Sequence, residues 1–556
     1  AGGRGAIYYT THSSTITYQA YGGVNTGLTD RLAGAGTIYK KSAAQSNGDL
    51  IIDNDDQDNW DDRFIGRTRI NETITFDSIT LQNYGNLETG SSSNITYTTL
   101  NWSNQGIITD NGGTFAIVSG GGSLTIPATA RLVGNTARTF TGLTVNGTLT
   151  HSNNTTAETY KLNYTINGDV LVASGGAINV NYKGYQHSEG PGAGGDSVSY
   201  GAGGAGYGGD GGDGLYNTGG FAYGSITAPN NIGSGGGDGA DTSYAGGAGG
   251  GAVKLTISGT LTVTGSITAN GQDYVSMWAG GGSGGSVWIN AGTLAGAGTV
   301  SANGGVGSTN DAAGGGGGRI AIYYTTDSPI ITYQACGGTR YNGNTDRMGG
   351  AGTIYKKVAA AANGDLTIDN NDQDSWDDRF IGRTPLNNTF TFDTITIQNY
   401  GNLETGSSSN ITYTTLNWSN QGIITDNGGT FAIVSGGGSL TIPATARLVG
   451  NTARTFTGLT VNGTLTHSNN TTAETYKLNY TINGDVLVAS GGAIDVNYKG
   501  YQHSEGPGAG TDTGGWAGGA GYGGDGGDGS TSAGGSAYGS ITEPSNIGSG
   551  GGDYAY

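Results

Sequence analysis

The sequence predicts an all-β fold of tandem repeats, each a β-solenoid of the parallel β-helix type with glycine-rich segments. Residues 82–194 recur as residues 398–510 with one difference, Asn179 against Asp495. Short runs of alternating apolar and polar residues, separated by turns that contain glycine, are typical of strands. Glycine supplies 113 of 556 residues and proline only 8, which excludes collagen because its Gly-X-Y chain needs abundant proline.

The repeat extends beyond the nearly identical stretch. Arg4–Tyr9 returns as Arg319–Tyr324, and the offset is 315 (319 − 4). We expect a first copy at 1–315, with β-rich parts at 4–188 and 252–315 and a glycine-rich part at 189–251. A truncated second copy is expected at 316–556, β-rich over 316–504 and glycine-rich over 505–556. Both ends of the sequence fall inside glycine runs, which indicates a window cut from a longer polypeptide. Such copies are typical of filaments, stalks and surface arrays.

Within a copy, one phrase recurs in which a glycine turn is followed by an apolar residue that restarts the alternation. It occurs at 84–87, 105–107, 122–124, 146–149 and 167–170, with glycine spacings of 21, 16, 25 and 21. The phrasing resumes at 255–267 and continues through 287–290 and 299–300. A strand–turn–strand phrase every twenty or so residues fits stacked coils that pair in parallel around a narrow core. The alternative is a series of β-sandwich repeats made of hairpins.

The glycine-rich part interleaves aromatic residues with its glycines, as at Tyr207, Tyr216 and Tyr223. The run at 208–213, Gly-Gly-Asp-Gly-Gly-Asp, has the three-residue step of an extended left-handed helix, and its glycines would let such helices pack closely. The alternative is a mobile surface loop. No helix of ordinary length stands out anywhere in the sequence.

Charge and composition exclude several classes of partner. Asp and Glu total 42 against 23 Lys and Arg, a net charge of −19, so nucleic acid and anionic membranes would be repelled. No apolar stretch approaches the roughly 20 residues of a membrane span. Cys336 is the only cysteine, so there is no disulfide framework.

The densest polar cluster predicts a calcium site in each copy, because crowded carboxylates on a loop can converge on a hard cation. The expected ligands are Asp53, Asp55, Asp56, Asp58, Asp61 and Asp62, and in the second copy Asp369, Asp372, Asp374, Asp377 and Asp378. The alternative is a solvated loop of turn-forming residues. The pairs Asp61–Asp62 and Asp377–Asp378 could also serve acid–base hydrolysis of polysaccharides. Adjacent strand residues point to opposite faces, however, which is poor geometry for one site.

Histidine and asparagine add little to this reading. His151, His187 and their second-copy counterparts His467 and His503 look like isolated polar-loop residues, and no catalytic or other cofactor-binding residue is indicated. Asn-X-Ser/Thr sequons are numerous and would be glycosylated only in an exporting organism that modifies them. They begin at Asn71, Asn94, Asn101, Asn146, Asn153, Asn154, Asn163, Asn387, Asn410, Asn417, Asn462, Asn469, Asn470 and Asn479.

Four phrases carry a family resemblance: those within 285–294, 315–324, 351–355 and 363–366. They resemble the large, glycine-rich tandem-repeat, β-helical, adhesin-like surface proteins of uncultured bacteria and archaea. The likeness covers most of each copy and lies in texture and short phrases. It implies an extracellular or cell-surface location and transfers no functional residue.

Three functions follow as expectations. The leading one is a non-enzymatic structural subunit of an extracellular fibre, sheath or stalk, whose partners are further copies of the repeat. The second is a surface adhesin whose Tyr- and Trp-bearing glycine-rich face binds glycans or another cell. The third is a polysaccharide-degrading enzyme.

Overall fold

The computed structural model describes residues 2–12, 16–23, 33–56, 66–240, 244–309, 311–327, 330–343, 347–373, 382–512 and 516–553. The fold is all-β, and parallel pairing dominates its sheets. The chain forms two compact units, Ala1–Thr367 and Ile368–Tyr556, called here the N-terminal and C-terminal units. The boundary falls inside strand β26 (Asp365–Asp369) and lies within the second copy.

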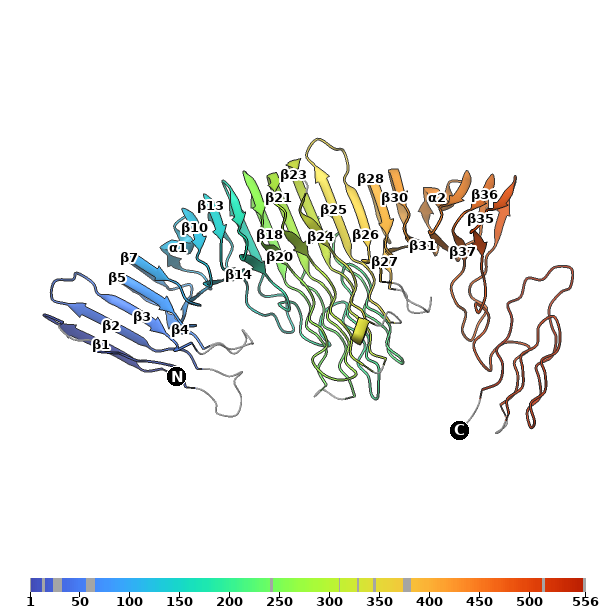
Figure 1. Ribbon diagram of the computed structural model, residues 1–556, viewed down its shortest axis with the longest axis horizontal. Helices are drawn as coiled ribbons and strands as arrows, with labels where there is room; N and C mark the ends of the chain where they lie inside the picture. The colour runs from blue at the N-terminus through green and yellow to red at the C-terminus, as the bar shows by residue number, and fades with distance from the viewer. Residues whose placement is uncertain are drawn as a thin grey trace. The chain divides into compact units, whose positions relative to one another are not determined.

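Three sheets make up the strands of the N-terminal unit (Figure 1). The first has the order β1-β2-β3-β5-β7-β9, with β1 Arg4–Tyr9, β2 Thr37–Ser42, β3 Asp49–Asp53, β5 Thr73–Gln82, β7 Asn94–Trp102 and β9 Thr114–Phe115. The second has the order β4-β6-β8-β11-β14-β17-β20-β22-β24, with β4 Thr68–Ile70, β6 Asn86–Thr89, β8 Ile107–Asp110, β11 Arg131–Gly134, β14 Thr148–Thr150, β17 Ala177–Asn179, β20 Ser266–Thr268, β22 Thr299–Ser301 and β24 Thr332–Gln334.

The third sheet runs β10-β13-β16-β19-β21-β23-β25-β26, and β12, β15 and β18 join it beside β21. Its bounds are β10 Ser123–Ile126, β12 Arg138–Phe140, β13 Gly142–Val145, β15 Leu162–Ile166, β16 Val170–Val172, β18 Ala252–Ile257, β19 Thr260–Val263, β21 Ser286–Ala295, β23 Arg319–Asp327 and β25 Thr353–Val358. The helices described in this unit are short, α1 (Ala116–Ser119) and the 3-10 turn η1 (Tyr341–Gly343).

The C-terminal unit repeats the arrangement of the first copy. One sheet has β27 Thr384–Pro385, β29 Asn402–Thr405, β31 Ile423–Asp426, β34 Arg447–Gly450, β37 Thr464–Thr466 and β40 Ala493–Ile494. The remaining strands are β28 Thr389–Gln398, β30 Asn410–Trp418, β32 Thr430–Phe431, β33 Ser439–Ile442, β35 Arg454–Phe456, β36 Gly458–Val461, β38 Tyr480–Ile482 and β39 Val486–Val488. A four-residue helix, α2 (Ala432–Ser435), matches α1. In the residues described here, no helix is long and apolar enough to cross a membrane.

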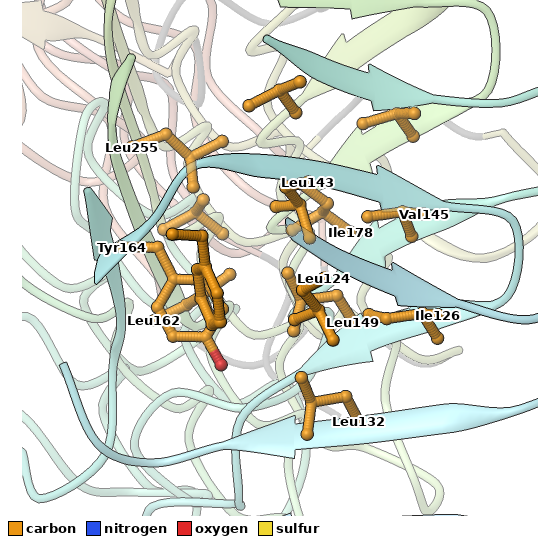
Figure 2. Packing of buried hydrophobic residues seen from close by; sticks show 14 of the residues in the cluster. Leu124, Ile126, Leu132, Leu143, Val145, Leu149, Leu162, Tyr164, Ile178 and Leu255 are labelled. Carbon is orange, nitrogen blue, oxygen red and sulfur yellow. The ribbon is translucent and has the colours of Figure 1, made fainter. Parts of the chain in front are cut away.

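Buried side chains stack in ladders along the parallel strands, as the alternating sequence predicts. In the second sheet of the N-terminal unit, residues paired across neighbouring strands are at most 1 % exposed: Leu87, Ile108, Leu132, Leu149, Ile178, Ile267 and Val300. A facing ladder in the third sheet holds Leu124, Leu143, Val170, Leu261 and Leu294. Figure 2 shows side chains of both ladders gathered between the strands. Full burial of each such side chain is worth about 1.5–3 kcal/mol.

The turn glycines serve a different purpose from the one their sequence context suggests. Asn-Gly and similar turns predict a left-handed glycine, but in the turn that ends at Gly85 the positive φ angles fall on Asn83 (52°) and Tyr84 (60°). A Cβ atom on Gly85 would lie 2.2 Å from the carbonyl oxygen of Ile52, in β3. Glycine is therefore required here because two backbones approach closely.

The described residues of the glycine-rich part form an ordered layer, as the prediction of closely packed extended helices requires, and not a mobile surface loop. Gly203 and Gly206 both donate to the segment 192–195, while Gly204 and Ala205, between them, donate to two other segments. The segment that accepts the hydrogen bond thus changes from one residue to the next and is the same again after three residues. This pattern is typical of packed extended helices with three residues per turn. A Cβ atom on Gly204 would lie 1.9 Å from the carbonyl oxygen of Gly314, so such positions admit only glycine.

Segments beyond the predicted glycine-rich part also join this layer. Gly281 donates to Ala313 over 3.0 Å, and Gly314 donates to Arg347 over 3.0 Å. The glycine layer thus comprises the described residues of 184–251, 269–285, 302–318 and 335–352. These segments run side by side away from the strands β18, β21 and β23 (Figure 1).

The junction between the two copies lies inside the N-terminal unit and is an ordinary parallel pairing. Strand β21 of the first copy pairs with β23 of the second copy, residue Val287 with Ile320 and Ile289 with Ile322. These residues are at most 1 % exposed. The ladder therefore passes from one copy into the next without a break.

Candidate functional sites

The Asp-rich loop of the first copy begins at Asp53, the last residue of β3. Its carboxylate accepts hydrogen bonds from the backbone N–H of Asp55 (2.9 Å), the side-chain amide of Gln82 (2.7 Å) and that of Asn83 (3.1 and 3.2 Å). The second copy repeats this arrangement around Asp369. Amide groups thus occupy both oxygens of this carboxylate.

The other expected calcium ligands are only partly described. Asp55 and Asp56 are exposed in a left-handed turn, with φ of 57° and 54°, and Asp372 matches them with φ of 57°. Outside the described residues lie Asp58, Asp61, Asp62, Asp374, Asp377 and Asp378. Over the described ranges, no three or more His, Cys, Asp or Glu side chains form a group that could hold a metal. Calcium binding and polysaccharide hydrolysis at these loops therefore stay predictions.

His151 lies between strands, as predicted for a loop residue, but its side chain is fully buried. Nδ1 donates to the carbonyl of Ser152 (2.8 Å), and Nε2 accepts the backbone N–H of Ala252 (3.2 Å) at the end of the glycine layer. Burial lowers the pKa of His151 from 6.5 to about 3, so the ring is neutral near pH 7.

His187 and Ser188, whose types also occur in catalytic triads, have separate acidic partners. His187 Nδ1 lies 2.8 Å from a carboxylate oxygen of Asp238. Ser188 donates to Asp196 instead of to the histidine. The serine is therefore not arranged as a nucleophile with the histidine as its base.

Aromatic side chains meet at the turns of the glycine layer in the N-terminal unit. The ring of Trp278 lies 5.3 Å from that of Tyr200 and 4.9 Å from that of Tyr244, and the rings of Tyr274 and Tyr341 are 6.0 Å apart. We call these five residues the aromatic turn cluster. Trp278 has φ of 64°, and its indole N–H is buried with no hydrogen-bond partner in the described structure. A bulky residue in the left-handed region is uncommon and often marks a functional site.

Backbone and ionic contacts hold these turns together. The backbone N–H of Trp278 donates to the hydroxyl of Ser308 (3.1 Å), and the backbone N–H of Leu215 donates to the carbonyl of Asp311 (3.1 Å). The carboxylate of Asp311 pairs with Arg340 (3.1 Å) and Arg347 (3.4 Å). The cluster therefore stands on a fixed scaffold.

The two copies differ at exposed positions of these turns. Leu215 and Tyr216, 40 % and 73 % exposed, correspond to Ser530 and Thr531 at the offset of 315. Trp516, 74 % exposed, lies in the second-copy turn that corresponds to that of Tyr200. This contrasts with the single difference over residues 82–194.

The sequence interpretation missed three members of the cluster. Tyr274, Trp278 and Tyr341 lie outside the predicted glycine-rich part at 189–251. The Gly- and Ala-rich runs at 279–285, 312–318 and 349–352 could have revealed that these turns belong to the same layer.

The last strands of the second copy expose a face that the first copy covers. In the first copy, residues 162–184 lie beneath residues 249–270, which include β18, β19 and β20. We call residues 249–270 the covering coil, and we call residues 478–500, which correspond to residues 162–184, the coil face. Positions that would correspond to the covering coil lie after residue 556. Val170 is accordingly 1 % exposed, whereas Val486 is 52 % exposed.

Two open cavities, of about 610 and 740 Å³, border the coil face. The larger is lined by His467, Val496 and Gly500, among others. In the first copy, their counterparts His151, Val180 and Gly184 bond to backbone groups of the covering coil.

Comparison of the chain with protein-family models, with curated proteins and with solved structures found no match.

Proposed function

We propose that this chain is a structural part of an extracellular fibre, sheath or stalk, built from tandem β-solenoid repeats. The coil interpretation is supported by parallel ladders that run through successive strands and by cores of stacked aliphatic residues. Hairpin sandwiches would need mostly antiparallel neighbours. The antiparallel pairs of the described strands are β2–β3 and β25–β26.

The observation that carries the proposal is the junction between copies. Eight residue pairs join β21 to β23 in the same parallel sense as the pairs within a copy. A strand of one copy that is buried by parallel pairing with a strand of the preceding copy is suited to serial addition.

The test is a length series. Chains with one, two and four complete copies of residues 1–315 would be expressed and measured by electron microscopy and small-angle scattering. We expect length to rise by a constant increment per copy, since each coil adds roughly 4.8 Å along the stack. Particles whose radius grows only as the cube root of mass would contradict the proposal.

A second candidate function is adhesion, and the aromatic turn cluster favours it. Binding residues are often carried by turns on a rigid scaffold, and Tyr, Ser, Gly and Asn are the residues that binding loops prefer. The turns at 197–200 and 273–278 contain Tyr and Ser, and the second also contains Trp278. Differences between otherwise similar copies at exposed turn residues fit surfaces that select ligands.

Trp278 supplies a direct readout of glycan binding. Neutral oligosaccharides added to the chain should change tryptophan fluorescence and bind saturably, and Trp278→Ala should abolish the binding. The control is Tyr8→Ala, which removes an exposed tyrosine from β1 (72 % exposed). Equal binding by both variants would rule out the cluster as the glycan site.

A further inference from the structure

A buried lysine contacts a side-chain amide at the same place in each copy. Lys183 Nζ lies 2.6 Å from Asn153 Oδ1, and Lys499 Nζ lies 2.6 Å from Asn469 Oδ1. Each lysine is 8 % exposed, although lysine is seldom buried. The strands beside the two pairs differ in exposure, yet the pairs match, so residues of the repeated segment itself fix this contact.

A neighbouring asparagine holds the two backbones of the pair against each other. The side-chain amide of Asn154 donates to the carbonyl of Lys183 (2.7 Å) and to that of Tyr160 (2.9 Å). Its side-chain oxygen accepts the backbone N–H groups of Thr159 and Tyr160, both over 2.7 Å. Asn470 makes the same set of contacts in the second copy. The lysine and its amide partner are therefore positioned by contacts that neither of their side chains provides.

These contacts place an amine beside an amide carbon. The Cγ atom of Asn153 is one C=O bond, about 1.2 Å, from the oxygen that Lys183 Nζ contacts, so Nζ lies at most about 3.8 Å from Cγ. Two reacting groups that a fold holds about 3–3.5 Å apart react far faster than free groups, because the entropy of bringing them together has already been lost. The folded chain thus brings a nucleophile to the carbon that it could attack.

We propose that Lys183 and Asn153, and likewise Lys499 and Asn469, become joined by an isopeptide bond. The lysine Nζ, once it has given up a proton, attacks Cγ of the asparagine; the Nζ–Cγ bond forms and the Cγ–Nδ2 bond breaks. The asparagine nitrogen leaves as ammonium and carries away two protons from the lysine ammonium group. The step consumes no oxidant, reductant or other reactant.

The bond would tie a loop of the β-rich part to the start of the glycine layer. Its two residues lie 30 positions apart, and Gly184, next to Lys183, donates to the carbonyl of Gly249 (2.7 Å). A cross-link between distant positions stabilises a fold mainly by restricting the unfolded chain. The bond would form within a copy whether or not copies stack into a fibre, so its absence would leave the fibre proposal unchanged.

Intact-mass spectrometry of the denatured 556-residue chain measures the bond directly. Each bond lowers the mass by about 17 Da, the mass of ammonia, so we expect about 34 Da less than the sequence mass. Proteolysis should release two branched peptides, one joining Asn153 to Lys183 and the other Asn469 to Lys499. The full sequence mass, after the folded chain has been kept at mildly alkaline pH, would overturn the proposal. A mass deficit without branched peptides would overturn it too, because cyclised Asn-Gly sites also lose ammonia.

Variants locate the bond in the first copy. Lys183→Arg should halve the mass deficit, measured against the variant's own sequence mass, and leave the bond of the second copy in place. Asn153→Ala should do the same from the other side of the bond. Lys161→Arg is the matched control, because Lys161 Nζ lies 3.2 Å from the carboxylate of Glu158 and not beside an amide. Circular dichroism would confirm that each variant is folded. An undiminished deficit in Lys183→Arg, or a halved one in Lys161→Arg, would refute the assignment.

Discussion

Residues 162–180 and 478–496 have the same sequence apart from Asn179 and Asp495, yet they lie in different surroundings. Ile178 is fully buried and Ile494 is 47 % exposed. Strand β15 has five residues where β38 has three, and β17 has three where β40 has two. The strand pairing of such a segment with the strands before it is thus the same in both copies, while its burial and the length of its strands depend on the strands that pair with it on the other side.

The one substitution between these segments preserves a local contact. Asn179 accepts the N–H of Asn181 (3.0 Å), and Asp495 accepts that of Asn497 (2.9 Å). Either side chain can form such a turn. The difference in exposure therefore does not arise from the difference in sequence.

The same substitution should destabilise the two copies to different degrees, because the side chain is buried in one copy and exposed in the other. Ile178→Asp places a carboxylate in a closed core and should destabilise the N-terminal unit by about 4 kcal/mol. Ile494→Asp should cost less than about 1 kcal/mol, because the side chain reaches water. Native-state hydrogen exchange with mass spectrometry can follow both sites, since peptides containing Asn179 or Asp495 differ in mass. Equal loss of protection would refute the account.

A smaller difference is expected in the glycine layer. A Cβ atom on Gly208 would lie 2.0 Å from the carbonyl oxygen of Gly318, whereas one on Gly523, its counterpart, would meet nothing within 4 Å. Gly208→Ala should therefore destabilise the layer by about 2–3 kcal/mol. Gly523→Ala should change stability by no more than about 0.5 kcal/mol. Calorimetric unfolding of the two variants compares them directly, and a neutral Gly208→Ala would show that the layer is loosely packed.

Acid should affect the first copy more than the second. The pKa of His151 is about 3 in the folded chain, below its usual 6.5, because of burial. Because the folded chain holds this histidine in its neutral form, the fold has its full stability above pH 6.5. That stability is lost as the pH falls from 6.5 toward 3, where the unfolded chain binds a proton and the folded chain does not. Between pH 6.5 and 5 the loss is about 2 kcal/mol.

Burial also lowers the pKa of His467, which has Lys499 nearby and Lys477 in the same cavity. His467 lacks the counterpart of Ala252 in the described structure, so we expect a smaller loss there. NMR titration of the two ring signals would check this, with His151→Gln and His467→Gln to assign them. A His151 ring that titrates near pH 6.5 would contradict the buried, neutral assignment.

The smallest expected effect is that of calcium. Ten-millimolar calcium acting on sites with millimolar affinity would stabilise the chain by about 1.4 kcal/mol, and EDTA should remove this. The first loop has Asp55 where the second has Asn371, so the first should bind more tightly. Asp55→Asn should give the two loops the same number of carboxylates and bring their calcium affinities together. Melting that is unchanged by chelation would leave only the solvated-loop interpretation.

Much of the strand pattern could be predicted from the sequence. Alternation around Leu124, Leu149 and Leu261 indicates inward side chains, and each lies in a buried ladder. The periodic glycine turns indicate stacked phrases. These signals are local, because the side-chain period of a strand is two whatever its partner.

The rest depended on contacts between distant segments. His151 meets Ala252 across 101 positions, so no local pattern could show that it lies in the core. Trp278 reaches Tyr200 only because separate glycine runs pack into one layer. The role of Gly85 likewise depends on the carbonyl group of Ile52, 33 positions earlier in β3.

The glycine layer also implies an unusual calorimetric behaviour. Its segments are joined by peptide N–H and C=O groups, and its interior contains few side chains such as Ala205 and Tyr207. Exposing peptide groups to water lowers the heat capacity, whereas exposing hydrocarbon raises it. Unfolding of this layer should therefore give a heat-capacity increment per residue below the usual 12–15 cal/mol/K. The stability of this part of the chain would then vary only gently with temperature, and it would persist in the cold, where apolar cores weaken.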